Sequence, residues 1–396
     1  MSNIPKLRFP EFNGEWEEKR FGDILSLNMV PVPKPDTEYE RLGIFCHNKG
    51  TFHEHITDPS YIALDTLYKV HKNNFIVNIT FAWEHAIAIT TQNDEDALVT
   101  FRFLMFSFNK GYYHQFFKYA FSKEKFRYDL NVASPGGAGR NRVLNQKQLN
   151  NINLIVPSIS EQEKIADFFS NVDSIIAVET KILNILQKKK KALMQKLFTQ
   201  QLRFKSADGT DFPAWEERKL GDVCSYIGGG TPSKKVKEYW NGNINWASVK
   251  DITGKYLYET QDKISQLGAD SSAINICEPD SLLLITRMSP GKTVITKCIT
   301  AINQDLKIVK SDINVEFLHL LFQSIQTKID EKTSGTTVKG ISIEGLNQID
   351  IRLPCKAEQQ KITACLSSLD SLIQNQQKVV TTWQQRKKAL LQQMFI

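Results

Sequence analysis

The chain has 396 residues, a formal net charge of +7 at pH 7, 41% hydrophobic residues and 23% charged residues. This composition is typical of a globular chain, and the length predicts two or three domains that each bury a core. No stretch approaches the roughly 18–20 apolar residues that span a bilayer, and the N-terminal region does not resemble a signal peptide. We therefore expect a cytoplasmic protein without a membrane partner. The modest positive charge is compatible with a polyanionic partner.

The chain repeats its own sequence. EWEEKRFGD at 15–23 returns as AWEERKLGD at 214–222, and KKALMQKLF at 190–198 returns as KKALLQQMF at 387–395. The second pair is separated by 387 − 190 = 197 positions. An internal repeat of this kind predicts two equivalent frames, made of the repeated border segments, around two inserts that do not align with each other. Two like frames with unlike inserts suggest like docking surfaces with different specificities.

The final part of each repeat predicts a long helix. Residues 161–198 and 358–395 contain neither Gly nor Pro, so each run can form one unbroken helix. Apolar residues recur in steps of three, four or seven, as in a coiled-coil seam. The predicted seam and subunit-docking residues are Ile165, Phe168, Val172, Ile175, Ile182, Leu186, Leu193, Ile362, Leu369, Leu372, Val379, Trp383 and Leu390.

Polar residues interrupt this predicted seam at matching places in the two repeats. Glu179 matches Gln376, and Lys189 matches Arg386. Such residues either fix the register of the two helices or lie away from the true contact.

The inserts, residues 28–140 and 227–335, mix strand-like and helix-like runs without a regular βαβ rhythm, which favours an α+β fold. The predicted strands include 73–80, 97–106, 281–286 and 306–310, and the predicted helices include 112–126 and 315–329. We therefore expect two tandem α+β domains separated by two long antiparallel coiled-coil helices with pseudo-twofold symmetry. The expected segments are a first domain at 1–157, a helical spacer at 158–199, a second domain at 200–354 and a second spacer at 355–396.

The second insert opens with a glycine-rich, then basic, then aromatic stretch at 227–252. Exposed backbone amides and lysines are suited to phosphate contacts, which makes Lys234 and Lys235 candidates. For Trp240 and Trp246 we favour burial in the core over stacking.

Both inserts end in polar, glycine-bearing loops, at 134–145 and 333–342. Arg140, Arg142 and Lys339 occupy corresponding places in these loops and could contact phosphate or guanine. Alternatively, the loops only close the domains.

Catalytic motifs are incomplete. SPGKT at 289–293 suggests a phosphate-binding loop, but the motif requires glycine where the chain has Thr286. His47, His53 and His55 have no second cluster that would complete a metal site. We expect no catalytic residue and no metal in this chain.

With these features together, the sequence resembles the specificity (HsdS-type) subunits of type I restriction-modification enzymes. The resemblance is carried by the two WEE phrases, GGGTPS with EYWNGNINW, the NQ of INQDLKIV, SGTTVKGIS, and the PxxxEQxKI segments at 157–165 and 354–362. It covers essentially the whole chain, although the first insert lacks GGGTPS and YWNG.

The resemblance implies a non-catalytic subunit with two target-recognition domains that each read half of a bipartite site in double-stranded DNA. It implies helices that set the spacing and dock two methyltransferase subunits, with restriction and translocase subunits joining the complex. S-adenosylmethionine, ATP and Mg²⁺ would then bind the partners, and no cofactor would bind this chain. The candidate DNA-contacting residues are Lys49, Arg140, Arg142, Lys234, Lys235, Arg287, Lys292, Thr336 and Lys339.

Two other hypotheses compete with this one. The chain could be a stand-alone DNA modification or cleavage enzyme with an unrecognised site, or a coiled-coil adaptor without a nucleic-acid role.

Overall fold

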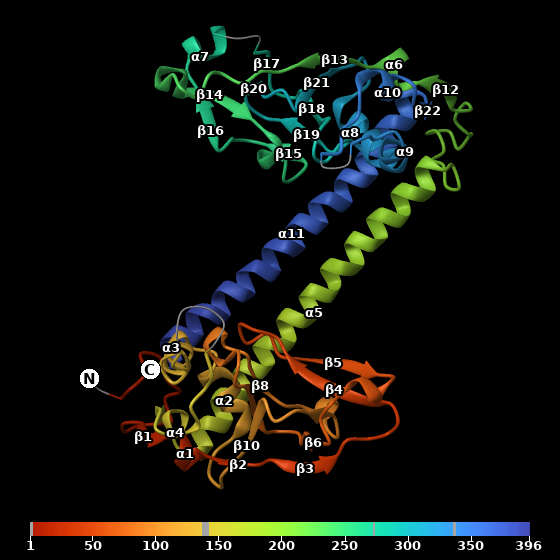
Figure 1. The fold of residues 1–396 in the computed structure, drawn as a ribbon. Helices are drawn as coiled ribbons and strands as arrows, with labels where there is room; N and C mark the ends of the chain where they lie inside the picture. Colours follow the sequence, from red (N-terminus) through yellow and green to blue (C-terminus); the bar gives the residue numbers. More distant parts are fainter. Residues whose placement is uncertain (1–2, 137–141, 272–273, 336–337) are drawn as a thin grey trace. The chain divides into compact units, whose positions relative to one another are not determined.

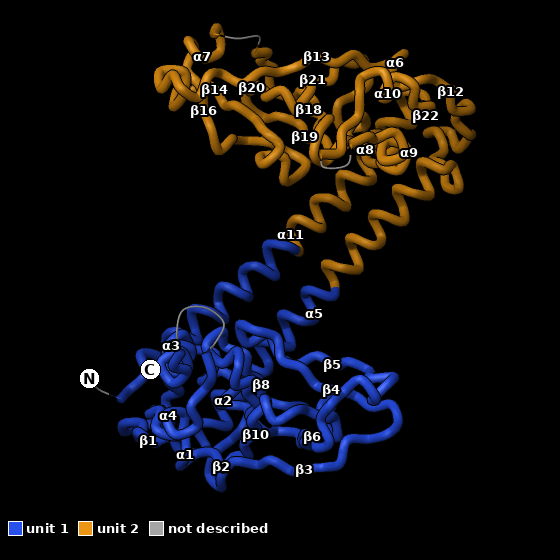
Figure 2. Tube along the Cα trace, in the orientation of Figure 1, with its two compact units in different colours: residues 1–181, 377–396 blue, residues 182–376 orange. Residues whose placement is uncertain are grey.

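The computed structural model describes residues 3–136, 142–271, 274–335 and 338–396. These residues form two compact units (Figure 2). Unit 1 comprises residues 1–181 and 377–396, and unit 2 comprises residues 182–376. Within the described residues, no helix is both long enough and apolar enough to cross a membrane.

Unit 1 has an antiparallel sheet, a mixed sheet and a two-stranded ribbon (Figure 1). The first sheet, in spatial order, contains β2 (Leu25–Leu27), β10 (Phe103–Phe108), β7 (Phe75–Asn78) and β8 (Ile87–Ile89). The second contains β3 (Val30–Pro33), β6 (Thr66–Lys69), β9 (Leu98–Val99), β4 (Tyr39–Ile44) and β5 (Thr51–Ile56). The ribbon pairs β1 (Glu17–Arg20) with β11 (Asn153–Val156). The helices are α1 (Phe21–Ile24), α2 (His114–Ala120), α3 (Glu124–Val132) and α4 (Gln146–Asn150), with short 3₁₀ turns η1 (Pro59–Tyr61), η2 (Ala82–Glu84) and η3 (Gln92–Asp94).

Unit 2 is built in the same way. Its first sheet contains β13 (Ser225–Gly228), β21 (Leu306–Lys310), β18 (Leu282–Ile285), β19 (Thr293–Thr296) and β15 (Tyr256–Leu257). Its second contains β16 (Asp262–Ile264), β14 (Trp240–Ala247), β20 (Thr300–Ile302) and β17 (Ile276–Cys277). The ribbon pairs β12 (Glu216–Lys219) with β22 (Asp350–Leu353). The helices are α6 (Leu220–Val223), α7 (Gln266–Asp270), α8 (Val315–Ser324), α9 (Gln326–Glu331) and α10 (Ile343–Asn347), with 3₁₀ turns η4 (Lys237–Tyr239) and η5 (Val249–Asp251).

The central strand pairings of the two units correspond one to one, although the inserts do not align in sequence. In unit 1, β10 lies antiparallel between β2 and β7, and β9 lies between antiparallel β6 and parallel β4. In unit 2, β21 lies antiparallel between β13 and β18, and β20 lies between antiparallel β17 and parallel β14. Only the edge strands β3 and β15 lack a counterpart among the described residues. The inserts are therefore two versions of one α+β fold.

The repeated WEE phrase marks where each frame closes. The Trp215 indole Nε1–H donates to the Glu358 carboxylate at 3.0 Å, and the Arg203 guanidinium donates to both Glu358 oxygens at 3.1 and 2.7 Å. In unit 1, Trp16 and Arg8 make the same contacts with Glu161. The repeated residues of each border thus tie the start of a domain to the helix that follows it.

Two long helices complete the frames: α5 (Ile159–Phe198) and α11 (Lys356–Met394). These bounds confirm the predicted helical runs. Each helix contributes to both units, and the end of one packs beside the start of the other. In unit 1, Phe395 packs 6.0 Å from Phe169, measured between ring centroids, so the helices run antiparallel there. In unit 2, Leu197 shares the core with Ile362 of α11.

The packed face of the helices differs from the predicted seam at alternate positions. Ile165 and Val172 are buried as predicted, but Ile175 and Ile182 are exposed, and Leu183 is buried instead. Helix α11 repeats the shift, because Leu372 and Val379 are exposed and Val380 is buried. Of the other predicted seam residues, Ile362 is buried, and Phe168, Leu186, Leu193, Leu369, Trp383 and Leu390 are half-buried.

The reason is that apolar residues stand side by side at Ile175–Ile176 and Ile182–Leu183. With a helical period of 3.6 residues, successive buried positions can be four and then three residues apart as well as three and then four. Either residue of each adjacent pair can therefore face the other helix. The same shift moves Lys189 and Arg386 into solvent.

Charged residues pair across the two helices within each unit. The Lys387 ammonium lies 2.5 Å from Asp173 in unit 1, and Lys190 lies 2.5 Å from Asp370 in unit 2. The two pairs are equivalent, since 370 − 173 = 197 and 387 − 190 = 197. Asp173 also accepts a hydrogen bond from the Tyr119 hydroxyl of α2. We infer that these pairs hold the register of the helices and link it to the domain.

Candidate nucleic-acid interface

In unit 2, four loops gather where the two sheets meet; we call residues 229–236, 286–292, 303–305, 334–335 and 338–341 the unit 2 loop cluster. The turn 303–305 joins β20 of one sheet to β21 of the other. Backbone hydrogen bonds tie the other loops to it: Thr286 N–H donates to the Asp305 carbonyl at 2.9 Å, and Gly230 N–H donates to the Ile302 carbonyl at 2.9 Å. Gly229 lies so close to β20 that an added Cβ would come within 2.2 Å of the Ile302 carbonyl oxygen.

The tryptophans of the second insert support its lysine-bearing loop through hydrogen bonds from their indole groups to the loop backbone. Trp246 is buried, Trp240 is half-buried, and their rings meet edge to face at 5.2 Å. The Trp246 indole N–H donates to the Gly230 carbonyl at 3.0 Å, and the Trp240 indole N–H donates to the Ser233 carbonyl at 3.2 Å. Lys234 and Lys235 follow on the exposed side of this loop. The expected core role of the tryptophans therefore also positions the two lysines.

Three more predicted cations lie in the unit 2 loop cluster. The side chain of Arg287 is 57% exposed and lies 3.3 Å from the Asp305 carboxylate. Gly340 pairs with Arg287 across an isolated β-bridge, which brings Lys339 beside this turn, and Lys292 is exposed at the end of the same loop. The cluster thus presents five exposed cationic side chains, those of Lys234, Lys235, Arg287, Lys292 and Lys339. Thr336 falls outside the described residues.

Unit 1 has a matching arrangement, the unit 1 loop cluster, formed by residues 45–50, 79–86, 100–102 and 142–144. Ile79 N–H donates to the Arg102 carbonyl at 2.9 Å, and Leu144 N–H donates to the Ile79 carbonyl at 2.9 Å. The hairpin turn that carries exposed Lys49 is held to η2, because Asn48 N–H donates to the His85 carbonyl at 2.8 Å.

Arg142 has partners within the domain. Its Nε donates to the Ser134 carbonyl at 3.0 Å, one Nη donates to the Asn131 carbonyl at 2.8 Å, and the guanidinium stacks 5.5 Å from the Trp83 ring. These contacts cap the carbonyl end of α3, as the loop-closing alternative requires. Any DNA contact by Arg142 would use its remaining donors and remains a prediction. Arg140 falls outside the described residues.

Sequence reasoning missed the turn 100–102 of unit 1. The run 97–106 was predicted as one strand, but it is divided into β9 and β10, which belong to different sheets. The turn between them leaves Phe101 51% exposed and Arg102 exposed. The signal in the sequence was a threonine and an arginine that flank an aromatic inside an otherwise apolar run.

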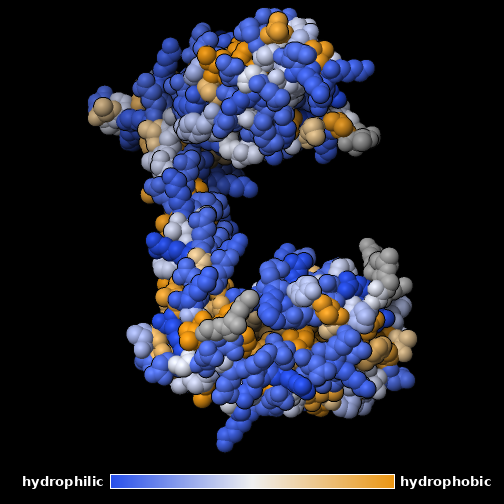
Figure 3. Space-filling view, turned by 90° about the vertical axis from the view of Figure 1, so that its left-hand side faces the viewer, coloured by the Kyte–Doolittle hydropathy of each residue, from blue (hydrophilic) through white to orange (hydrophobic). Residues whose placement is uncertain are grey.

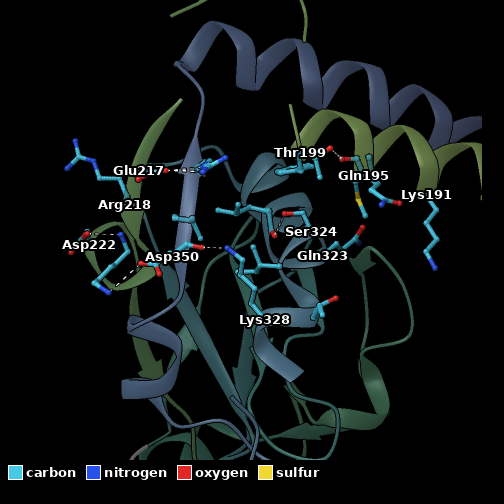
Figure 4. Close-up of a pocket in the computed structure, with 18 residues that line it drawn as sticks. Lys191, Gln195, Thr199, Glu217, Arg218, Asp222, Gln323, Ser324, Lys328 and Asp350 are labelled. Atoms are coloured by element: carbon cyan, nitrogen blue, oxygen red, sulfur yellow. Dashed lines mark hydrogen bonds and ion pairs between the residues drawn. The ribbon is translucent and has the colours of Figure 1, made fainter. Parts of the chain in front are cut away.

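A cavity of about 990 Å³ lies in the frame of unit 2 and not at the loops (Figure 4). It is bordered by the end of α5, the ribbon β12–β22 and helices α8 and α9. Several of its charged side chains are paired: Arg352 donates to Glu217 at 3.1 Å, and Lys328 donates to the Asp350 carbonyl at 2.7 Å. The Ser324 hydroxyl donates to a helix carbonyl at 2.7 Å. This lining offers no paired nucleophile and base of the kind that catalysis requires.

Other groups with catalytic potential are held in structural roles. Burial raises the pKa of the Cys46 and Cys224 thiols to about 11, which keeps both neutral. Burial also lowers the pKa of His319 to about 4. Its Nδ1 lies 2.8 Å from the Thr293 hydroxyl, and its Nε2 lies 2.7 Å from the Gln323 amide nitrogen. The face of each unit seen in Figure 3 is largely hydrophilic, with scattered apolar patches.

The class of fold is that of the specificity subunits of type I restriction-modification systems. The chain superposes on the crystal structure of the S subunit from M. genitalium with a TM-score of 0.60, covering 99% of both chains at 14% identity. A structure of a type I restriction-modification system matches with a TM-score of 0.58, covering 96% of this chain and 97% of the other at 16% identity. At these identities the likeness concerns the fold.

Sequence similarity gives the family. The model of the type I restriction modification DNA specificity domain matches residues 13–188 and 214–382, so the chain belongs to this family and carries its domain twice. The MjaIX specificity subunit of Methanocaldococcus jannaschii is 31% identical over 189 residues, which cover 46% of this chain and 44% of the relative. The EcoR124I/EcoR124II specificity subunit of Escherichia coli is 27% identical over 224 residues, which cover 54% and 53%. The matched regions span about half the length of these relatives.

Proposed function

We propose that this chain is the DNA sequence-specificity subunit of a type I restriction-modification complex, in which each loop cluster reads one half of a bipartite site in double-stranded DNA. The observation that carries this proposal is the duplicated loop cluster. The two units share every central strand pairing, yet their clusters present different side chains. A common scaffold with different loops is the arrangement that two independent readers require.

The chemistry of the loop clusters fits DNA. Lysines and arginines on exposed loops neutralise phosphates and position a protein on the duplex, while neighbouring polar and apolar groups meet base edges. In unit 2, Lys234, Lys235 and Arg287 lie on loops that are bonded to a turn that exposes an amide side chain at Gln304. The family match favours this reading over a stand-alone enzyme or a coiled-coil adaptor.

We further propose that two methyltransferase subunits dock on the repeated frames and that restriction and translocase subunits join them. Two equivalent frames provide two equivalent sites for identical partners. Exposed apolar residues on the long helices, such as Ile175 and Val178 in unit 1 and Leu372 in unit 2, are candidate contacts. S-adenosylmethionine, ATP and Mg²⁺ would bind these partners. The two helices would set the gap between half-sites.

An insert exchange tests this proposal. Replacing residues 227–335 with the insert of another family member, in a chain co-expressed with its methyltransferase, should change one half-site of the methylated motif and leave the other intact. A change in both half-sites would contradict independent reading. S-adenosylmethionine binding by the purified chain alone, measured by calorimetry, would instead support the stand-alone enzyme.

A further inference from the structure

The turn at which the chain passes from one sheet to the other is equivalent in the two units. In unit 1, Ile79 N–H donates to the Arg102 carbonyl, and Leu144 N–H donates to the Ile79 carbonyl. In unit 2, Thr286 N–H donates to the Asp305 carbonyl, and Ile341 N–H donates to the Thr286 carbonyl. All four distances are 2.9 Å. Residues 100–102 and 303–305 therefore occupy the same place in the fold.

The two turns also close in the same way. The Thr100 hydroxyl accepts from Arg102 N–H at 3.4 Å, and the Asn303 side-chain oxygen accepts from Asp305 N–H at 3.1 Å. In each case the first residue of the turn holds the third through its side chain. The central residue, Phe101 or Gln304, is exposed in each turn.

The central residues have opposite chemistries. Phe101 is 51% exposed, and such a ring has no hydrogen bond to offer a base. It suits apolar contact with a thymine methyl group or wedging at a base step. The amide oxygen of Gln304 accepts from the Thr231 hydroxyl, which orients the amide group. A glutamine in this position suits paired hydrogen bonds with adenine.

Cations flank the central residue in both units. Arg102 is exposed next to Phe101, and Arg287 lies 3.3 Å from Asp305, the neighbour of Gln304. Phosphate contacts by these guanidinium groups would hold the turn against the duplex and direct its central side chain towards the groove.

We propose that Phe101 and Gln304 are corresponding specificity-determining residues, each reading bases in its own half-site through the turn that joins the two sheets. The inference rests on the proposed function and adds to it the residue in each unit that contacts the bases of the half-site. One position in a shared fold, occupied by an aromatic ring in one unit and an amide in the other, gives the two half-sites different base preferences.

The test uses the full chain co-expressed with a type I methyltransferase and a plasmid library with randomised inserts, scored by adenine methylation. The variants are Phe101→Ala and Gln304→Ala. Each should reduce base preference by roughly 5- to 150-fold at one or two positions of one half-site and leave the other half-site unchanged. The matched controls, Tyr61→Ala on η1 and Gln348→Ala after α10, are exposed residues outside the clusters and should keep both half-sites.

Conservative variants keep the test decisive if an alanine variant fails to fold. Phe101→Leu should retain an apolar preference, and Gln304→Glu should change the preferred base, because a carboxylate accepts hydrogen bonds and pairs with cytosine N4. Full wild-type preference in all folded variants would overturn the inference, as would a single substitution that altered both half-sites. A wild-type complex without a split motif would overturn the proposed function itself, which is a distinguishable result.

Discussion

The buried carboxylate of Glu358 provides the sharpest test of how each frame is held together. Its side chain is 0% exposed and accepts two hydrogen bonds from Arg203 and one from Trp215. Replacing it with glutamine keeps the shape but removes the charge and one acceptor oxygen. Breaking a buried ion pair costs about 3–5 kcal/mol. The Arg203 side chain is 27% exposed and regains some hydration, so we expect a loss of roughly 2–4 kcal/mol.

Thermal unfolding measures this loss. Unit 2 has 376 − 182 + 1 = 195 residues, and for this size about 1 kcal/mol lowers Tm by roughly 2–4 °C. Glu358→Gln should therefore lower the Tm of unit 2 by about 6–12 °C for a loss of ~3 kcal/mol. The control, Glu259→Gln, removes an exposed pair with Lys263 in the same unit and should cost less than about 0.5 kcal/mol. Equal shifts for the two variants would refute the reasoning.

Three further predictions concern pH, salt and helix register. Burial depresses the folded pKa of His319 to about 4 from an unfolded value of 6.5, so between these values the unfolded state binds a proton that the folded state does not. The free energy of unfolding of unit 2 is therefore undiminished above pH 6.5 and decreases as the pH falls towards 4. Unit 2 should lose on the order of 3 kcal/mol over that range, and His319→Phe, followed by denaturant titration, should lose much less. Replacing Lys234 and Lys235 with alanine should reduce the magnitude of the slope of log DNA-binding affinity against log salt concentration by about 1.8. An unchanged slope would exclude both lysines from phosphate contact. Asp173→Lys should destabilise unit 1, and adding Lys387→Asp should restore part of the loss; a coupling energy below about 0.5 kcal/mol would show that the pair does not hold the register.

The frame of this protein was predictable because its signals are local and repeated. Two periodic apolar runs without Gly or Pro predicted α5 and α11, and the duplicated phrases predicted two equivalent units. The side-chain partners of those phrases were not predictable: Glu161 meets Arg8 and Trp16, which are more than 140 positions away in the sequence. Such contacts depend on the folded path of the chain.

The proposed DNA-reading surface was only partly predictable. Lysines in the glycine-rich loop stand out in the sequence, and the structure places them at the loop cluster. The turn around Phe101 was hidden, because a run of apolar residues has the same periodicity whether it stays in one sheet or crosses to another. The equivalence of Phe101 with Gln304 appears only when the strand pairings are compared, since the inserts have no alignable sequence.

The helix seam shows a third kind of limit. Adjacent apolar residues at Ile175–Ile176 and Ile182–Leu183 fit two seams equally well. The choice between the seams depends on the partner helix, and the burial of Leu183 and Val380 identifies it.

The methylated motif is the measurement that tests the central claim most directly. Cells that express this chain with a type I methyltransferase should carry adenine methylation at a single motif, composed of two specified half-sites separated by a gap of fixed length. The same methyltransferase without this chain should leave that motif unmethylated. Methylation without a fixed split motif, or an identical pattern in the absence of the chain, would contradict the proposal that this protein selects the DNA sequence.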